Sequence, residues 1–351
     1  MEEIKQPNNA PVLMLCPAFR VENGIITQVN DAAAAYAVQI GTDITKLIHI
    51  GIQEFSEFTQ GRLDLTLSVE NTLFNASVFP DDTGYTFCLD SDFVQPELRA
   101  FALAAQQLRE PLSNAIISAE GIPENADPEA RSQLSHIRRN LQQMMRILCN
   151  MSDVAGYSAN ANLQTRNVVS VFEEVLEKAK SLLEKANKHL QIQLPQQPIF
   201  CGADEKMLER AVLNLLSNAA TFSADGDTIN ISLFAKKQRL YFSVENNCRG
   251  ENSQNRDLFA RYLREPVIEE GRNGIGLGLP IVRAVAAAHG GTVLMDQPKS
   301  GTIRTTMTIS LQAHNTPSLR SAIQIPYDYS GGWDHCLMEL SGVLPAELYE
   351  D

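Results

Sequence analysis

Two runs of apolar residues with alternating spacings of three and four constrain the fold of this 351-residue chain more than any other feature. The first run consists of Leu98, Phe101, Ala105, Leu108, Leu112, Ala115 and Ala119. The second run consists of Leu134, Ile137, Leu141, Met144, Leu148, Met151 and Ala155. The stretch GIPENADP lies between them, and its glycine and two prolines favour a turn. The spacing therefore predicts two helices joined by a turn, which form an antiparallel hairpin.

A single hairpin of this kind has little to pack against, because each helix offers one apolar stripe. Pairing with a second copy would complete a four-helix bundle, so we expect a homodimer. The heptad pattern alone also fits a coiled-coil arm that has no catalytic role.

The composition and charge of the chain exclude several classes of protein. Lys and Arg number 29 against 42 Asp and Glu, a net charge of -13, and no basic run stands out. We therefore expect no nucleic-acid partner. The six cysteines form no CxxC pair, which is typical of reduced thiols. The apolar run VLMLC near the N-terminus is too short to span a bilayer, so we expect a cytoplasmic protein with no membrane span.

Residues 1–95 show the shorter period of β-strands. In RLDLTLSV, the alternation places Leu63, Leu65, Leu67 and Val69 on one face of a strand. AAAAYAV favours a short helix, and PDDTG favours a turn between two strands. These elements predict a small α+β domain. Their order, entered by VENGIITQVNDAA, resembles a PAS-type sensor domain, and another small α+β domain fits the same pattern.

The sequence QQLREPL lies in the first heptad run, and its polar residues fall outside the apolar seam. The heptad phase turns Gln106, Gln107 and Glu110 outward. Pro111 has no amide hydrogen to donate to the carbonyl oxygen of Gln107, so the helix should bend there. A bent and exposed patch on a hairpin helix is a suitable place for another domain to reach.

A second set of motifs indicates a phosphate ligand. The segment LERAVLNLLSNAATFS, residues 208–223, is predicted to be a helix that carries Asn214 and Asn218 on one face. Two carboxamides on one face can hold phosphate oxygens and a hydrated magnesium ion, which prefers oxygen ligands. Taken alone, an NxxxN pattern has little specificity.

The later sequence GIGLGLPIVRAVAAAHGG places three glycines before a helix predicted to start near Leu279. These glycines are Gly274, Gly276 and Gly278. Backbone amides at a glycine-rich helix start suit a polyphosphate. A dinucleotide fingerprint is disfavoured because residue 279 is not glycine, and a P-loop is excluded because no Gly-Lys-Ser or Gly-Lys-Thr follows. His289, at the far end of this helix, is predicted to be a structural cation beside the helix dipole.

Together, NLLSNA, FARYLR and GIGLGLPIV resemble, in this order and spacing, the ATP-binding domain of sensor histidine kinases. QQLREPL is similar to that family's H-E-L-R-T-P-L motif on the first helix of a dimerisation hairpin. The resemblance covers residues 96–312 and implies a GHKL-type α/β sandwich, which gyrase, Hsp90 and MutL-type ATPases share. It also implies ATP with Mg²⁺ as cofactor, with Asn218 near the metal through the nucleotide. The nucleotide-binding residues that it implies are Asn214, Asn218, Asn246, Arg261, Arg264, Gly274, Gly276 and Gly278.

The chain departs from the family pattern where the chemistry takes place. The phosphoacceptor histidine is replaced by Gln106, whose amide nitrogen cannot attack phosphorus because its lone pair is delocalised. The assisting acid and threonine are replaced by Gln107 and Glu110. Autophosphorylation at this motif is therefore not expected. His136 on the second helix is an alternative phosphoacceptor, but a lone exposed histidine is more often an ordinary surface residue.

The nucleotide site is altered as well. Asn246 stands at the position of the adenine-binding aspartate, Cys248 at the first glycine of that loop, and Thr221 at a lysine. If the changes at Asn246 and Thr221 each lose about 1 kcal/mol, ATP affinity falls roughly thirtyfold. We therefore expect ATP binding to be weakened or lost.

These observations predict an α+β multidomain protein with four parts. They are a PAS-like sensor domain at 1–95, a dimerisation helical hairpin at 96–160, a histidine kinase-like ATP-binding domain at 161–312 and a C-terminal tail at 313–351. The tail contains Trp333 and either docks through it, on its own chain or on a partner, or is a plain packed extension.

Three functions fit this organisation. The first is a degenerate kinase that acts through conformation as a dimeric regulatory scaffold and docks a response-regulator receiver near Gln106. The second is a working protein histidine kinase that phosphorylates His136 or a histidine on a partner. The third is a noncatalytic structural dimer that binds no nucleotide. We favour the first, because the scaffold is intact around the missing chemistry.

Overall fold

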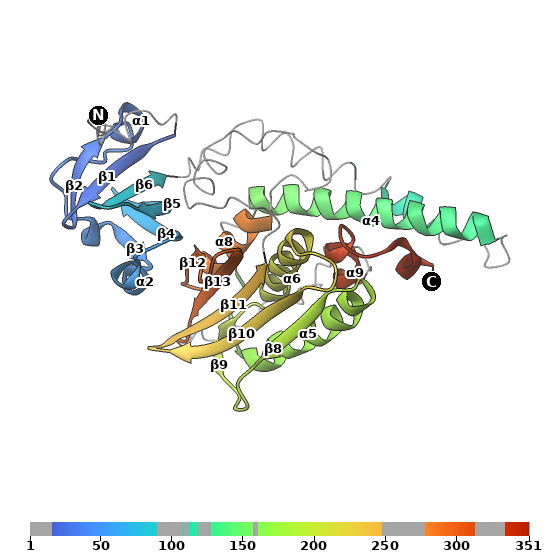
Figure 1. Cartoon of the computed structure of the whole chain (residues 1–351). Helices are drawn as coiled ribbons and strands as arrows, with labels where there is room; N and C mark the ends of the chain where they lie inside the picture. The colour runs from blue at the N-terminus through green and yellow to red at the C-terminus, as the bar shows by residue number, and fades with distance from the viewer. Residues whose placement is uncertain are drawn as a thin grey trace, which may run out of the picture.

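The computed structural model describes residues 16–89, 108, 112–117, 119, 128–156, 161–247, 278–312 and 334–350. Figure 1 shows an N-terminal β-domain, a long helix α4, and a layered α/β domain beneath that helix. The C-terminal segment returns to lie between α4 and the α/β domain. Among the helices of these residues, none has the length and apolarity needed to cross a membrane.

The N-terminal domain is an antiparallel sheet with short helices. Its strands are β1 (Ala18–Glu22), β2 (Ile25–Val29), β3 (Ile48–Ile50), β4 (Arg62–Val69), β5 (Thr72–Pro80) and β6 (Tyr85–Leu89). Its α-helices are α1 (Asp31–Ala34) and α2 (Ile52–Glu57). The strand order is β2-β1-β6-β5-β4, and β3 also pairs with β4.

The alternation predicted for RLDLTLSV is confirmed. The four residues that β4 buries in the apolar core of this domain are Leu63, Leu65, Leu67 and Val69. In the same core, the rings of Phe19 and Phe87 stack with centroids 5.0 Å apart. The short helix predicted for AAAAYAV is α1, and the side chain of Asn30 caps it by accepting from the amide of Ala33 at 2.8 Å. That this domain is of the PAS type stays a prediction.

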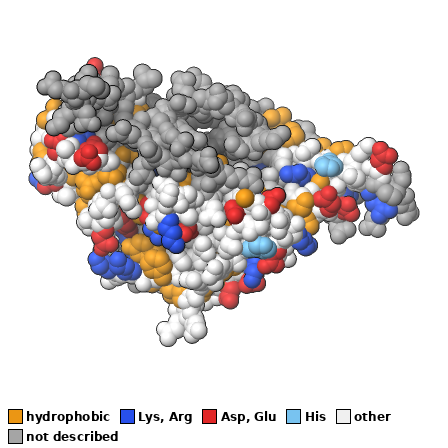
Figure 2. Space-filling model, viewed as in Figure 1, with side chains coloured by type: hydrophobic (Ala, Val, Ile, Leu, Met, Phe, Trp, Pro, Cys, Tyr) orange, Lys and Arg blue, Asp and Glu red, His pale blue; other side chains and the backbone are white. Residues whose placement is uncertain are grey.

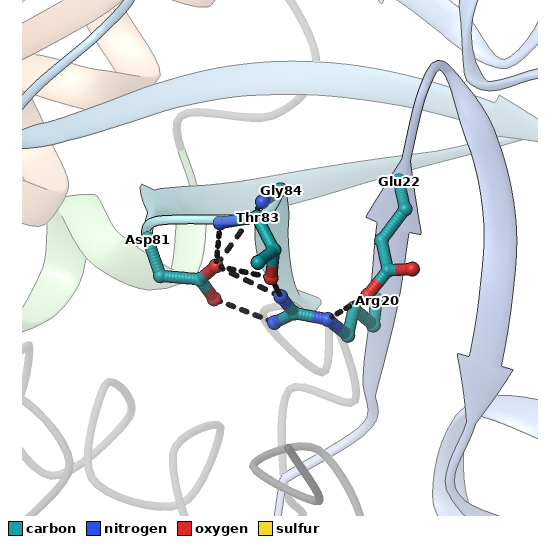
Figure 3. A network of polar contacts seen from close by, with 5 residues as sticks. All are labelled: Arg20, Glu22, Asp81, Thr83 and Gly84. Carbon is teal, nitrogen blue, oxygen red and sulfur yellow. Dashed lines mark hydrogen bonds and ion pairs between the residues drawn. The ribbon is translucent and has the colours of Figure 1, made fainter.

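A network of polar contacts closes the turn between β5 and β6 (Figure 3). Arg20, which is only 1% exposed, donates to both carboxylate oxygens of Asp81 at 2.5 and 2.8 Å. It also donates to Thr83 Oγ1 at 2.5 Å and to Glu22 at 2.7 Å. The hydrogen bond from Arg20 lowers the pKa of Asp81 to about 2, and the same bond raises the pKa of Arg20. Strand β1 is thereby tied to the β5–β6 turn.

The second helix of the predicted hairpin is confirmed as α4 (Pro128–Gly156). Of the first helix, the structure describes Leu108, residues 112–117 and Ala119, all of which are helical. The seam positions Leu98, Phe101 and Ala105 lie outside the described residues. The dimeric four-helix bundle stays a prediction, because the structure contains one chain.

The predicted seam is only partly buried within one chain. Its buried members are Leu112, Ala119, Leu134 and Leu148. Its exposed members include Leu108 (54%), Ile137 (50%) and Met144 (54%). Ala115 is exposed as well, whereas its neighbour Ile116 is buried with Leu112. The larger side chain of Ile116 removes more apolar surface from water than a methyl group does, so the helix turns that face inward.

The α/β domain is a mixed sheet with helices packed on it. Its strands are β7 (Gln164–Asn167), β8 (His189–Gln193), β9 (Phe200–Ala203), β10 (Thr228–Lys236), β11 (Arg239–Asn247), β12 (Val293–Asp296) and β13 (Thr302–Ser310). Its helices are α5 (Val168–Lys185), α6 (Glu205–Phe222) and α8 (Gly278–Ala288). The order β12-β13-β11-β10-β8 is antiparallel except for the parallel pair of β8 and β10, and β7 pairs with β9.

Strand alternation in this sheet produces two layers. Ile229, Ile231 and Leu233 of β10 are buried beneath the helices, whereas the residues between them face the other side. Phe172 of α5 packs on Phe242 of β11, with ring centroids 4.7 Å apart. The α/β sandwich expected within residues 161–312 is confirmed for this layer of strands and helices.

The two domains share one continuous sheet, which the sequence did not predict. Strand β12 pairs antiparallel with β4, with Leu294 opposite Leu63. Gly61, just before β4, has a φ of +87°, and a Cβ there would collide with the carbonyl oxygen of Met295. Glycine therefore allows the two strands to approach.

The C-terminal segment forms α9 (His335–Leu340) and the 3-10 helix η3 (Ala346–Tyr349). Asp334 caps α9 by accepting from the amide of Leu337 at 3.0 Å. Leu340 and Leu344 have no exposed surface and belong to the core of the α/β domain. This segment therefore packs on its own chain, and Trp333 lies outside the described residues.

The visible surface carries no large region of a single charge. On the face shown in Figure 2, the described basic and acidic side chains alternate without an extended basic patch.

Candidate nucleotide-binding site

Helix α6 carries the two asparagines of the predicted phosphate site. Asp204 caps its first turn by accepting from the amide of Met207 at 3.2 Å. Asn214 has no exposed surface, and its Nδ2 donates to the carbonyl oxygen of Arg210 at 2.9 Å. Asn218 lies one turn later on the same face and is half-buried. The two carboxamides are thus held by a capped, well-packed helix.

The start of α8 lies directly against these asparagines. A Cβ built on Gly278 would lie 2.9 Å from Asn214 Oδ1 and 3.5 Å from the carboxamide of Asn218. A larger residue would have to displace them, so glycine is required for this approach. Asn214 Oδ1 is buried and has no hydrogen-bond partner among the described residues. An unpaired carboxamide oxygen beside a helix start fits Mg²⁺ with a polyphosphate, because the oxygen suits the metal or its water and the amides suit the anion.

Asn246, the predicted adenine contact, lies near the end of β11 and is 8% exposed. Its Nδ2 donates to the carbonyl oxygen of Asn247 at 2.8 Å, which leaves Oδ1 as the atom to accept from an adenine amino group. Thr221 donates its hydroxyl to the carbonyl oxygen of Ser217, one turn earlier in α6, at 2.7 Å. At that position the chain contributes a satisfied hydroxyl in place of a cation.

Several predicted site residues lie outside the described part of the chain. They are Gln106, Gln107, Glu110, Cys248, Arg261, Arg264, Gly274 and Gly276. Their roles stay predictions, whereas the structure does bring Asn214, Asn218 and Gly278 together. In the described residues, no cluster of His, Cys, Asp and Glu side chains could hold a metal ion by itself.

The two histidines identified from the sequence have different surroundings. His136 is exposed on α4. His289 is buried, and its Nε2 accepts from the backbone amide of Asp204 at 3.0 Å while its Nδ1 donates to the carbonyl oxygen of Val285 at 2.8 Å. An imidazole that accepts at one nitrogen and donates at the other is neutral. The predicted structural role of His289 is confirmed, and the predicted positive charge is wrong.

Sequence reasoning missed Arg210, which is fully buried in α6. Its guanidinium binds Glu339 and Asn150, at 3.1 and 2.9 Å. A local signal existed, because Arg210 lies four residues before Asn214 and so on the same helix face. Its partners are 129 and 60 residues away in the sequence, so no local pattern could identify them.

Comparison with known proteins gives a family for this site. Residues 203–315 match the family model described as histidine kinase-, DNA gyrase B-, and HSP90-like ATPase. The sensor protein KdpD of Clostridium acetobutylicum is 28% identical over 197 residues, which cover 54% of this chain and 22% of that protein. The adaptive-response sensory kinase SasA of Crocosphaera subtropica is 28% identical over 227 residues, covering 59% of this chain and 58% of that one. The chain thus spans less than two thirds of the length of these relatives.

Solved structures show matches of the same kind. Full-length ShkA in complex with AMPPNP matches 61% of this chain and 46% of that chain, with 22% identity and a TM-score of 0.47. Histidine kinase ThkA in complex with response regulator protein TrrA matches 88% of this chain and 99% of that chain, with 14% identity and a TM-score of 0.40. The nucleotide analogue and the regulator are properties of those complexes.

Proposed function

Because this chain belongs to the sensor histidine kinase family, we propose that it is a degenerate member that signals as a dimeric regulatory scaffold. The observation that carries this proposal is Gln106 at the phosphoacceptor position, with Gln107 and Glu110 at the assisting positions. An amide nitrogen has no lone pair available for attack on phosphorus, so the transfer to this position is lost. Helix α4 and the α/β sheet with its helices are nevertheless present.

The proposed ligand is ATP with Mg²⁺, bound more weakly than in a typical member. Asn214, Asn218 and Gly278 support this, since they form a close group with an unpaired buried oxygen. Asn246 supplies a neutral acceptor for adenine, which forms a weaker hydrogen bond than a carboxylate does. Thr221 supplies no charge near the phosphates.

Calorimetric titration of the full chain with ATP, with and without magnesium, tests nucleotide binding. We expect a dissociation constant about thirtyfold above the micromolar range, tightened by magnesium. Asn218→Ala should abolish the heat of binding, and Asn230→Ala, on the exposed side of β10, should leave it unchanged. If the unaltered chain gives no heat, the noncatalytic structural dimer becomes the better description.

The proposed dimer rests on apolar side chains that one chain leaves exposed on the hairpin. They are Leu108 (54%), Ile117 (61%), Ile137 (50%) and Met144 (54%). A second hairpin packed on these residues would form the four-helix bundle. Sedimentation of the chain carrying Ile137→Lys and Met144→Lys should show a monomer where the unaltered chain sediments as a dimer.

The proposed partner is a response-regulator receiver, docked on the hairpin face near Gln106. The proposed compartment is the cytoplasm. None of the described cysteines takes part in a disulfide, which agrees with a reducing environment; they are Cys16, Cys88, Cys149, Cys201 and Cys336.

A working kinase that phosphorylates His136 is the second candidate, and the exposure of this residue on α4 favours it. Incubation of the purified chain with labelled ATP and magnesium separates the two candidates. An acid-labile label on the chain, absent from His136→Gln, would replace the degenerate kinase with an active one. The degenerate kinase predicts that no label is retained.

A further inference from the structure

The C-terminal segment, residues 334–350, contributes to two separate cores. It lies between α4 and the α/β domain (Figure 1). Met338 has no exposed surface and packs with Met145 and Cys149 of α4. Leu340, two residues later, is buried in the core of the α/β domain. A single turn of helix therefore joins the hairpin to the nucleotide-binding domain.

A buried charge cluster lies at the centre of this joint. Glu339 of α9 has no exposed surface, and its Oε1 lies 3.1 Å from Arg210 Nη1 of α6. Its Oε2 lies 3.3 Å from Arg146 Nε of α4. Arg210 also donates to Asn150 of α4 at 2.9 Å. Charges removed from water are stable only while their partners stay in place, so this cluster favours one arrangement of the three helices.

The α4 residues that hold the C-terminal segment form a stripe of their own. Arg139 and Gln143 donate to the carbonyl oxygen of Ser341, at 3.0 and 2.8 Å. Ser341 ends α9, so these donors satisfy a carbonyl group that a helix end leaves open. Arg146 and Asn150, which belong to the charge cluster, follow Arg139 and Gln143 along the same helix. The four residues are separated by four, three and four positions, a heptad spacing that places them on one side of α4. One stripe of α4 is thus apolar, and another binds the C-terminal segment.

We propose that residues 334–350 form a clamp that holds α4 against the nucleotide-binding domain and can open while both parts stay folded. The contact combines the buried charge cluster with apolar side chains, Met338 against α4 and Leu340 against the domain, whereas most of each core forms without this segment. Closed, the clamp fixes α6, and with it Asn214 one turn beyond Arg210, relative to the hairpin. Open, it frees the domain to move. This clamp requires no nucleotide binding, so it stands apart from the proposed function.

Three native cysteines can report on the clamp, so no cysteine needs to be introduced by mutation. Cys149 on α4 and Cys336 on α9 are buried at the joint, and Cys201 on β9 is buried in the domain core. Burial raises the pKa of Cys336 to about 12 and the pKa of Cys201 to about 11, which slows their reaction with alkylating reagents. Opening of the clamp would expose the first two thiols and leave Cys201 protected.

The test is pulsed alkylation of the full chain with iodoacetamide, followed by mass spectrometry of the cysteine peptides. In Glu339→Gln, the buried arginine loses its counter-charge, so labelling of Cys149 and Cys336 should rise at least about tenfold while Cys201 is unchanged. The matched control is Glu347→Gln, which removes the same charge from an exposed position in the same segment. It should label like the unaltered chain.

A second variant separates loss of charge from general damage. Replacing Arg210 and Glu339 together, by methionine and leucine, removes both buried charges and keeps the volume, so protection of Cys149 should return. Labelling that stays high in this double variant would overturn the role of the charge cluster. The clamp itself would be overturned by unchanged labelling in Glu339→Gln. An equal rise at Cys201 would also overturn it, because the segment would then belong to a single folding unit.

Discussion

The two ends of the chain are joined to the α/β domain by different kinds of interaction. The N-terminal domain is joined through the backbone, by pairing of β4 with β12. The C-terminal segment is joined through side chains, centred on Glu339 and its two arginines. Backbone pairing depends on strand geometry and register, and hardly on which side chains are present. A cluster of buried charges fails when one member is removed, so single substitutions should affect the two joints unequally.

Both exposed and buried ion pairs surround the first joint. Lys237 lies 2.7 Å from Glu57, and both side chains are at least half exposed. Arg239 lies 3.3 Å from the buried Glu54. Exposed pairs of charges add little stability because water and salt screen them. The contributions that matter at this joint are therefore the buried pair of Arg239 and Glu54 and the close approach of Gly61 to the backbone of β12.

The largest expected effect is at the C-terminal joint. Arg210→Met leaves Glu339 buried with only one cation, so we expect the free energy of unfolding to fall by about 3 kcal/mol. Urea unfolding followed by circular dichroism measures it. Lys206→Met, on the exposed side of the same helix, should change it by less than about 0.5 kcal/mol. Equal losses in the two variants would contradict the importance of the buried cluster.

The next effect is at the N-terminal joint and acts through the backbone. Gly61→Ala places a methyl group against Met295 and should lower the free energy of unfolding by about 2 kcal/mol more than Gly41→Ala does. Gly41 shares the left-handed backbone, with a φ of +88°, and has nothing near its Cβ position. Backbone amides of β12 should exchange hydrogen faster in Gly61→Ala than in Gly41→Ala, which would show that the loss of stability arises at the pairing of β4 with β12. Identical exchange in the two variants would show that strand contact does not restrain this joint.

The partly exposed ion pair of Arg20 and Asp81, within the N-terminal domain, should have an intermediate effect on the free energy of unfolding. The pKa of Asp81 is about 2, below the ordinary 3.8, so its pairing with Arg20 stabilises the fold above pH 3.8 and is lost as pH falls towards 2. The carboxylate is 41% exposed, which reduces the contribution to about 1 kcal/mol. Asp81→Asn should remove this part of the pH dependence. Thermal unfolding between pH 2 and 5 measures it, and parallel curves for the two proteins would contradict it.

The smallest effect is expected at the exposed ion pairs of the first joint. Lys237→Gln should shift the midpoint of thermal unfolding by less than about 1 °C, because its partner Glu57 is well solvated. Scanning calorimetry at low and high salt measures it. A large shift that disappears in high salt would mean that charges, as well as backbone pairing, hold the N-terminal domain in place.

The elements of this fold were predictable where a segment buries a stripe of its own residues. The alternation in β4 and the helical spacing in α4 and α6 each follow from such stripes. The burial of Ile116 was not predicted, because this residue lies beside the heptad position and not on it. The pairing of β4 with β12 was not predictable, because a strand edge presents backbone groups that are common to all sequences.

One conclusion about the site follows from the sequence without any structure. The side chain of Gln106 cannot act as a nucleophile whatever the fold, because the lone pair of its amide nitrogen is delocalised. Other features depend on folding. The approach of Gly278 to Asn214, and the meeting of Arg210 with Glu339 across 129 residues, leave no periodic trace in the chain. Such contacts arise when separate elements pack together, and their strength comes from the exclusion of water that packing achieves.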